Sequence, residues 1–170
     1  MDAATRRRAI ADALAASDGP VAASALGERF GVSRQIVVGD VALLRASGME
    51  ITATPRGYLL GSGMDAGARR TVACVHGFEG MERELNIMVD NGCTVLDVVI
   101  EHAVYGQLTG ELHLKSRRDV QEFMSRSRAN GGSPLSTLTG GIHTHTLLCP
   151  DEAAFERCRD ELRSAGILLE

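Results

Sequence analysis

A glycine-rich break at residues 61–70 limits this chain to folds that are built from two separate cores. The segment holds three glycines, one serine and two alanines, and it has no helical or strand periodicity. Such a composition is typical of a flexible linker. The chain has 170 residues, which is enough for two small domains. We therefore predict an N-terminal domain over residues 1–61, a linker over 62–70 and a C-terminal domain over 71–170.

The N-terminal part has the element order of a winged helix-turn-helix. Its apolar spacing predicts helices over 4–16, 23–30 and 34–47, and strands over 51–54 and 58–60. Gly31 tolerates the positive φ required between the second and third helices, and Ser33 is a suitable N-cap for the third. The buried side of that third helix is expected to consist of Ile36, Val37, Val41 and Leu44.

The start of the third helix is the predicted DNA-reading surface. Ser33 as N-cap leaves Arg34 and Gln35 directed outward, at the end of the helix that this motif inserts into the major groove. Arginine can pair with guanine and glutamine with adenine. Arg45 and Arg56, in the turn of the hairpin, are expected to contact phosphates. The alternative is a three-helix packing module that does not touch DNA.

The charge distribution permits DNA binding although the whole chain is acidic. The net charge is -4. Residues 1–60 carry seven arginines and six acidic residues, a net +1, so the acidity lies in residues 61–170. A dimeric reader that places a few arginines on phosphates does not need a basic surface throughout.

The chain also lacks the signals of export and membrane insertion. It has no apolar run of about 18 residues, and its first residues do not resemble a secretory signal. The four cysteines form no CxxC pair, so we expect reduced thiols in a cytoplasmic protein.

The C-terminal part alternates strands and helices. The pattern predicts strands over 71–76, 94–102, 107–114 and 141–148, and helices over 79–91, 117–129 and from residue 152 to about 164. This βαββαβα order predicts a two-layer α+β domain similar to the phosphocarrier HPr, with helices on one face of the sheet.

All five histidines follow the linker, and three of them suggest a metal site. His143 and His145 alternate in one strand, so both imidazoles point to the same side. His76 lies at the end of another strand. The next helix offers Glu79, Glu82 and Glu84, and spacing leaves the choice among these three open. Three imidazoles and one carboxylate suit one divalent transition metal ion, although a lone HxH is as often a polar pair without a ligand.

Two further features suggest a small anionic ligand. Gly140 and Gly141 let a ligand approach backbone N–H groups. Arg117 opens a helix, where a carboxylate is favoured, although a capped helix with a solvated arginine fits the same residues.

Several motifs resemble the niacin-responsive transcriptional repressors, which join a winged helix-turn-helix to a three-histidine (3H) domain. The matching strings are VSRQ (32–35), RGY (56–58), ELNIMVDNG (84–92), TVLDV (94–98), VYG (104–106), KSRRDV (115–120) and PLSTLTGGIHTH (134–145). The family usually has proline after the histidine that precedes VYG, whereas Ala103 follows His102 here.

The resemblance implies one zinc- or nickel-type ion per chain, held by His76, Glu84, His143 and His145; it selects Glu84 over the other two glutamates. It also implies a homodimer, not an enzyme, that binds operator DNA in response to nicotinic acid and controls genes for NAD synthesis and niacin uptake. Effector contacts are expected from His102, Arg117, Gly140 and Gly141.

Two other functions fit the same residues. A metal-dependent hydrolase fused to a DNA-binding domain could use Glu79 or His102 as its base. A repressor that senses only the metal would respond to the ion and ignore nicotinic acid.

Overall fold

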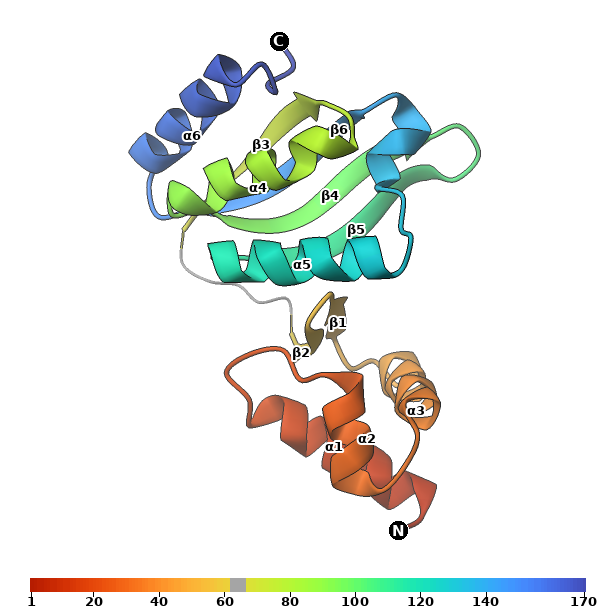
Figure 1. Cartoon of the computed structure of the whole chain (residues 1–170). Helices are drawn as coiled ribbons and strands as arrows, with labels where there is room; N and C mark the ends of the chain where they lie inside the picture. Colours follow the sequence, from red (N-terminus) through yellow and green to blue (C-terminus); the bar gives the residue numbers. More distant parts are fainter. Residues whose placement is uncertain (62–66) are drawn as a thin grey trace. The chain divides into compact units, whose positions relative to one another are not determined.

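A computed structural model describes residues 1–61 and 67–170, which form two compact units (Figure 1). The N-terminal unit contains, in order, α1 (Ala3–Ala15), α2 (Ala23–Phe30), α3 (Arg34–Ala46), β1 (Ile51–Thr54) and β2 (Gly57–Leu60). The two strands pair antiparallel, with Thr54 opposite Gly57. The predicted order of three helices and a hairpin is confirmed.

Local chemistry explains how α3 is set. Gly31 ends α2 with φ 66°, the left-handed conformation that glycine adopts without strain. Ser33 then accepts a hydrogen bond from the Ile36 N–H and caps α3. Val37, Val41 and Leu44 pack into the unit's core as predicted, but Ile36 is 44% exposed. Its predicted burial was wrong, because the first turn of α3 extends past the core.

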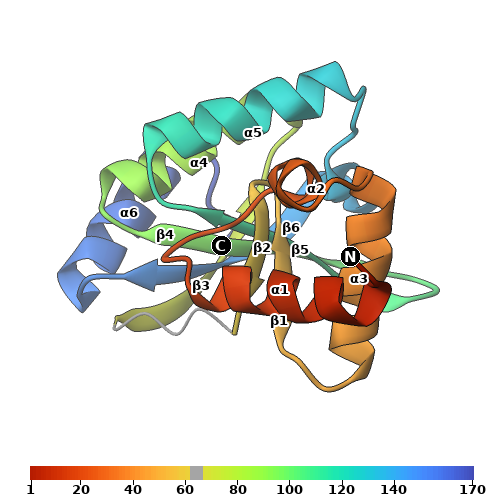
Figure 2. The ribbon, with the colours of Figure 1, turned by 90° about the horizontal axis from the view of Figure 1, so that it is seen from below.

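The C-terminal unit is a four-stranded sheet with helices on one face (Figures 1 and 2). Its elements are β3 (Ala68–Val75), the 3-10 turn η1 (Phe78–Gly80), α4 (Met81–Asp90), β4 (Thr94–His102), β5 (Gly106–Leu114), α5 (Arg117–Ala129), the 3-10 turn η2 (Leu135–Thr139), β6 (Ile142–Cys149) and α6 (Glu152–Ser164). The strand order is β3-β6-β4-β5, and every neighbouring pair is antiparallel. The predicted two-layer βαββαβα architecture is confirmed.

Two boundaries differ from the prediction. Residues 62–66 of the predicted linker lie outside the described residues, and its last three residues, 68–70, belong to β3 because they pair with β6. The helix predicted over 79–91 is instead the turn η1 followed by α4, and η2 was not predicted at all.

The core of this unit contains a disulfide between Cys93 and Cys149. The expectation of four reduced cysteines was therefore wrong. The physical reason is register: Thr94 pairs with Leu148 across β4 and β6, which brings the adjacent cysteines together although 56 positions separate them in sequence. Cys74 and Cys158 are free and buried.

No helix among the residues that the structure describes is long and apolar enough to span a membrane.

Candidate metal centre

Three elements bring four polar side chains into the interior of the C-terminal unit. His143 and His145 point from β6 toward the helices, and each is only 3% exposed. Glu84 lies in the first turn of α4 and is 1% exposed. His76 follows the last residue of β3, beside the start of β6. Charged and polar side chains are rarely buried this fully unless they are paired or bind a ligand.

The carboxylate of Glu84 is the centre of this cluster. His76 Nε2 lies 2.7 Å from Glu84 Oε2, and His143 Nε2 lies 2.9 Å from Oε1. His145 Nε2 is 3.3 Å from Oε2. The three rings therefore present the same nitrogen to one carboxylate.

The opposite nitrogens of the rings are all held by backbone carbonyls. The Nδ1 atoms of His76 and His143 lie 2.6 and 2.8 Å from the carbonyl oxygens of Gly77 and Gly141. His145 Nδ1 lies 2.6 Å from the carbonyl oxygen of Asp97, in the part of β4 where the pairing register with β6 shifts. A carbonyl only accepts, so each Nδ1 must donate its proton. In a neutral ring this leaves the Nε2 lone pair directed at the carboxylate.

This arrangement fits a cation. Lone pairs of Nε2 that face carboxylate lone pairs repel one another unless a positive charge lies between them. Within the described part of the chain, His145 Nε2 is a buried atom without a hydrogen-bond partner. Two donors bound to one ion at about 2.1 Å lie roughly 3 to 3.5 Å apart. The His145 nitrogen is at such a separation from Glu84, while those of His76 and His143 are at hydrogen-bond distance. Backbone carbonyls on the far nitrogens are the usual support of metal-binding histidines.

The charges of the cluster are coupled. Burial disfavours the charged form of Glu84, but His145, His143 and His76 outweigh it and hold the pKa of Glu84 well below its usual range. Burial likewise opposes the charged form of His76 and His145, yet the Glu84 carboxylate raises the pKa of both. In the absence of an ion, protons are the only positive charges that can satisfy Glu84.

The structure turns one of the three candidate glutamates inward. Glu79 and Glu82 line an open groove on the outer side of α4, and Glu82 pairs with Arg128 at 3.0 Å. Only Glu84 of the three faces the imidazoles. Glu84 lies on the buried face of α4 with Met81, Leu85 and Met88, so the helical spacing of these apolar residues was the signal that could have selected it.

Cys74 is a buried donor that the sequence analysis missed. It is paired with His143 across β3 and β6, so both side chains point to the same side. Its Sγ, a Glu84 oxygen and a His143 nitrogen all lie within 4.8 Å of one another. Burial, followed by the Glu84 charge, raises the pKa of the thiol. The alternation of Cys74 with His76 in one strand was the signal that could have revealed it. The three imidazoles have carbonyl-held rings and converge more closely, so we regard them as the principal set.

The structure engages the amides of the two predicted effector glycines within the chain. The N–H groups of Gly140 and Gly141 both donate to the carbonyl oxygen of Ser136 and so have no hydrogen left for a ligand. Gly141 instead permits a close approach: it has φ 93°, and a Cβ there would lie 2.5 Å from the His76 carbonyl oxygen. This contact brings His76 next to β6.

The other two predicted effector residues lie apart. His102 ends β4 at the same end of the sheet as Gly141, because Val99 pairs with Thr144. Its Nδ1 accepts hydrogen bonds from the N–H groups of Val104 and Tyr105, and its ring stacks on the Tyr105 ring. Arg117 pairs with Asp90 at the end of α4, about 9 Å further along the helix than Glu84. The structure does not bring Arg117 to the histidines.

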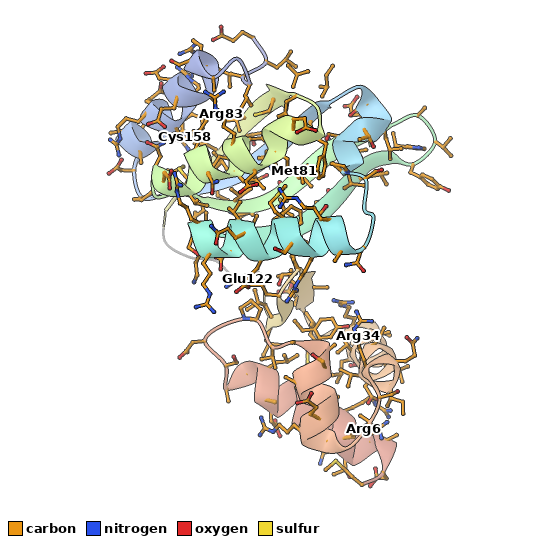
Figure 3. The ribbon with its side chains drawn as sticks, viewed as in Figure 1. Arg6, Arg34, Met81, Arg83, Glu122 and Cys158 are labelled. Atoms are coloured by element: carbon orange, nitrogen blue, oxygen red, sulfur yellow. A yellow bond between two sulfur atoms is a disulfide. The ribbon has the colours of Figure 1, made fainter. Side chains whose placement is uncertain are left out.

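In the N-terminal unit, Ser33, Arg34 and Gln35 are all exposed at the start of α3, where Figure 3 marks Arg34. Arg45 has a structural contact, since its Nε donates to the Ile51 carbonyl at 2.7 Å and its guanidinium lies 5.7 Å from the centre of the Tyr58 ring. Arg56 occupies the turn between β1 and β2.

Comparisons with known proteins match both units. Residues 6–59 match a family described as an HTH domain, and residues 69–170 match the 3H domain. The chain is 41% identical to the probable transcription repressor NiaR of Thermotoga maritima, over 97% of this chain and 94% of that protein. It is 40% identical to the transcription repressor NadR of Bacillus subtilis, over 98% of this chain and 94% of that protein.

Both relatives are named as repressors, which agrees with the prediction of a regulator that is not an enzyme and gives no support to the hydrolase alternative. The match extends over nearly the full length of each protein. The chain therefore belongs to the NiaR/NadR family of transcription repressors, in which an HTH domain precedes a 3H domain.

Proposed function

We propose that this protein is a cytoplasmic repressor that binds operator DNA as a homodimer in response to nicotinic acid. Through this binding it controls genes for NAD synthesis and niacin uptake. The repressor names of its relatives support the first part of this proposal. The single observation that carries the sensing part is the convergence of three Nε2 atoms on the buried Glu84 carboxylate.

The DNA-binding surface consists of the exposed first turn of α3 with Ser33, Arg34 and Gln35. Arg34 and Gln35 would read base edges in the major groove. Arg56 would contact the backbone from the hairpin, and Arg45 would add a phosphate contact with the guanidinium N–H groups that Ile51 leaves unused. A two-fold dimer would place two copies of α3 on half-sites about 34 Å apart.

His76, Glu84, His143 and His145 would hold one divalent transition metal ion, of zinc or nickel type. The bound ion would supply positive charge and an open coordination position for a nitrogen or carboxylate donor of nicotinic acid. His102 and the exposed Tyr105 at the same end of the sheet are the nearest candidates to contact the pyridine ring. The effector acts only if it binds the DNA-competent state more tightly than the other state.

Gel-shift titrations on the DNA upstream of the protein's own gene test this proposal. We expect nicotinic acid to change the DNA affinity of the metal-loaded protein, and we expect the change to disappear with a chelator or in His143→Ala. Arg34→Ala is the matched control, because it should weaken DNA binding but leave calorimetric binding of nicotinic acid intact.

Two results would contradict parts of the proposal. DNA binding that responds to metal and ignores nicotinic acid would indicate a metal-only sensor. Unchanged nicotinic acid binding by His143→Ala would remove the ion from the sensing step.

A further inference from the structure

We infer that Cys74 gives the metal centre a second donor set, in which thiophilic ions bind through Cys74 Sγ, Glu84 and His143. This inference rests on the proposed metal function of the same site. It adds a ligand that changes which ions the centre accepts and which residues they engage.

The pairing of β3 with β6 places the Cys74 side chain beside the three imidazoles. The inner faces of β3 and β6 contribute four neighbouring positions around Glu84: Cys74, His76, His143 and His145. Cys74 is directly opposite His143, and both are almost completely buried. Opposite His145 the inner face of β3 carries Val72, whereas opposite His143 it carries the thiol of Cys74.

The distances make the second set a compact one. The ligand atoms of Cys74, Glu84 and His143 lie within 4.8 Å of one another. An ion bound to a thiolate at about 2.3 Å and to nitrogen or oxygen at about 2.1 Å needs donors roughly 3.5 Å apart. A bound ion would therefore have to draw the three donors together from separations of up to 4.8 Å.

A buried nitrogen beside the same carboxylate supports a cation in this interior. His145 Nε2 is buried and has no hydrogen-bond partner among the described residues, although it points at the same carboxylate. A closed structural cluster would pair that nitrogen. Cys74 thus lies beside a buried carboxylate that needs positive charge. Cys158 on α6 is also free and buried, but it is not among the three clustered donors Cys74, Glu84 and His143 (Figure 3).

The two donor sets share Glu84 and His143, so one ion at a time would occupy the centre. Imidazole and carboxylate suit nickel and zinc, whereas thiolate favours softer ions such as Cd²⁺. A Cd²⁺ ion would displace the thiol proton to solvent and bind the thiolate, with His76 and His145 outside its donor set. Whether His76, which lies between β3 and η1, coordinates the ion would then depend on whether the ion is hard, like Ni²⁺, or soft, like Cd²⁺.

Cadmium titration of the metal-free, full-length protein under non-reducing conditions tests the inference. Cadmium–thiolate bonds produce a charge-transfer band in the ultraviolet. We expect this band in the wild type and in Cys158→Ser, and its absence in Cys74→Ser. We also expect Cys74→Ser to bind Cd²⁺ about 10- to 100-fold more weakly while its Ni²⁺ affinity stays within about twofold.

The possible results separate this inference from the proposed function. Cadmium bound by the wild type without a sulfur ligand in its X-ray absorption spectrum would overturn the role of Cys74 and leave the three-histidine centre standing. A thiolate band that persists in Cys74→Ser would also overturn it. Failure of the wild type to take up either Ni²⁺ or Cd²⁺ would overturn both. If Cys74→Ser does not fold, the Cys158→Ser spectrum decides the matter, because Cys74 is then the one free cysteine that remains.

Discussion

Among the described residues, the most deeply buried carboxylates of the two units, Asp40 and Glu84, are satisfied in different ways. In the N-terminal unit, Asp40 is 3% exposed and lies 2.6 Å from Arg6 Nε, with Arg7 at 3.7 Å. In the C-terminal unit, Glu84 is 1% exposed and faces three imidazoles. Arginine carries a permanent charge, whereas a neutral imidazole offers only a lone pair at Nε2.

The difference indicates which buried charge is structural and which serves a ligand. The Arg6–Asp40 pair joins α1 to α3 and is complete in itself. The Glu84 cluster has its outer nitrogens tied to carbonyls and its inner nitrogens directed at the carboxylate, so only protons or a metal ion can complete it. Burial alone does not distinguish the two cases; the chemistry of the partners does.

The largest predicted effect is on metal affinity, when one of the proposed metal-binding histidines is replaced. This substitution tests whether Glu84, unlike Asp40, belongs to a metal site. We expect His145→Ala to lose at least about 100-fold in Ni²⁺ affinity, since even changes to residues that support ligands cost 10- to 100-fold. The wild type should gain about 2.7 kcal/mol of stability at about 100 times the Kd of the ion, and His145→Ala should gain almost none. Thermal unfolding with and without Ni²⁺ measures both.

Asp40→Ala is the matched control for that prediction. It should destabilise the protein by about 2 kcal/mol, because it removes charged hydrogen bonds to Arg6. Its gain in stability on metal addition should equal that of the wild type. A metal-dependent gain that survives in His145→Ala, or vanishes in Asp40→Ala, would show that the comparison of the two carboxylates is mistaken.

The two adjacent glycines before β6 allow a sharper test of how the centre is built. Gly141→Ala should cost about 2 kcal/mol or more and weaken metal binding, because a Cβ there would lie 2.5 Å from the His76 carbonyl oxygen. Gly140 also has a positive φ, but no atom lies within 4 Å of an added Cβ. Gly140→Ala should therefore cost about 1 kcal/mol and leave metal affinity unchanged. Equal metal affinities for the two variants would argue against a role of Gly141 in positioning His76.

The pH dependence of the metal-free protein tests whether protons replace the ion. The pKa values of His76 and His145 are raised above their ordinary 6.5, so their contribution to stability is present below that value and is lost as pH rises through the raised pKa. The lowered pKa of Glu84 contributes stability above its ordinary 4.5 and loses it as pH falls. The metal-free protein should therefore be less stable at about pH 9 than at about pH 6.

The metal-loaded protein should show the opposite trend, because ions and protons compete for the same Nε2 atoms. Thermal unfolding in chelator and in Ni²⁺ at both pH values measures the contrast. Metal-free protein that is equally stable at both values would show that the imidazoles are not held by protons.

The sequence predicted the elements better than the contacts within the site. Periodicity placed nearly every helix and strand, and alternation put His143 and His145 on one face. The spacing of Met81, Leu85 and Met88 places Glu84 on the same buried face of α4, a signal that the comparison of the three glutamates alone did not use. The Cys93–Cys149 disulfide escaped prediction because it depends on how β4 and β6 align. Local pattern determines the elements, whereas the alignment of distant strands determines which side chains meet.

The smallest predicted effect concerns α3 alone. Gly39 lies within this helix, and no atom lies within 4 Å of a Cβ placed there. Gly39→Ala should therefore stabilise the protein by about 0.5–1 kcal/mol, since alanine loses less backbone entropy than glycine in a helix. Denaturant unfolding of the metal-free and metal-loaded protein measures this gain, which should be the same in both forms.

Gly27 provides the control for this last prediction. It also lies within a helix, α2, but the structure leaves no room for the Cβ that Gly27→Ala would add. A Cβ at Gly27 would lie 2.7 Å from the Val32 carbonyl oxygen, in the turn between α2 and α3. Gly27→Ala should thus destabilise the protein although alanine is the better helix former. If both substitutions stabilised the protein, propensity alone would govern this unit, and the close packing of the turn that presents Arg34 and Gln35 would not matter to its stability.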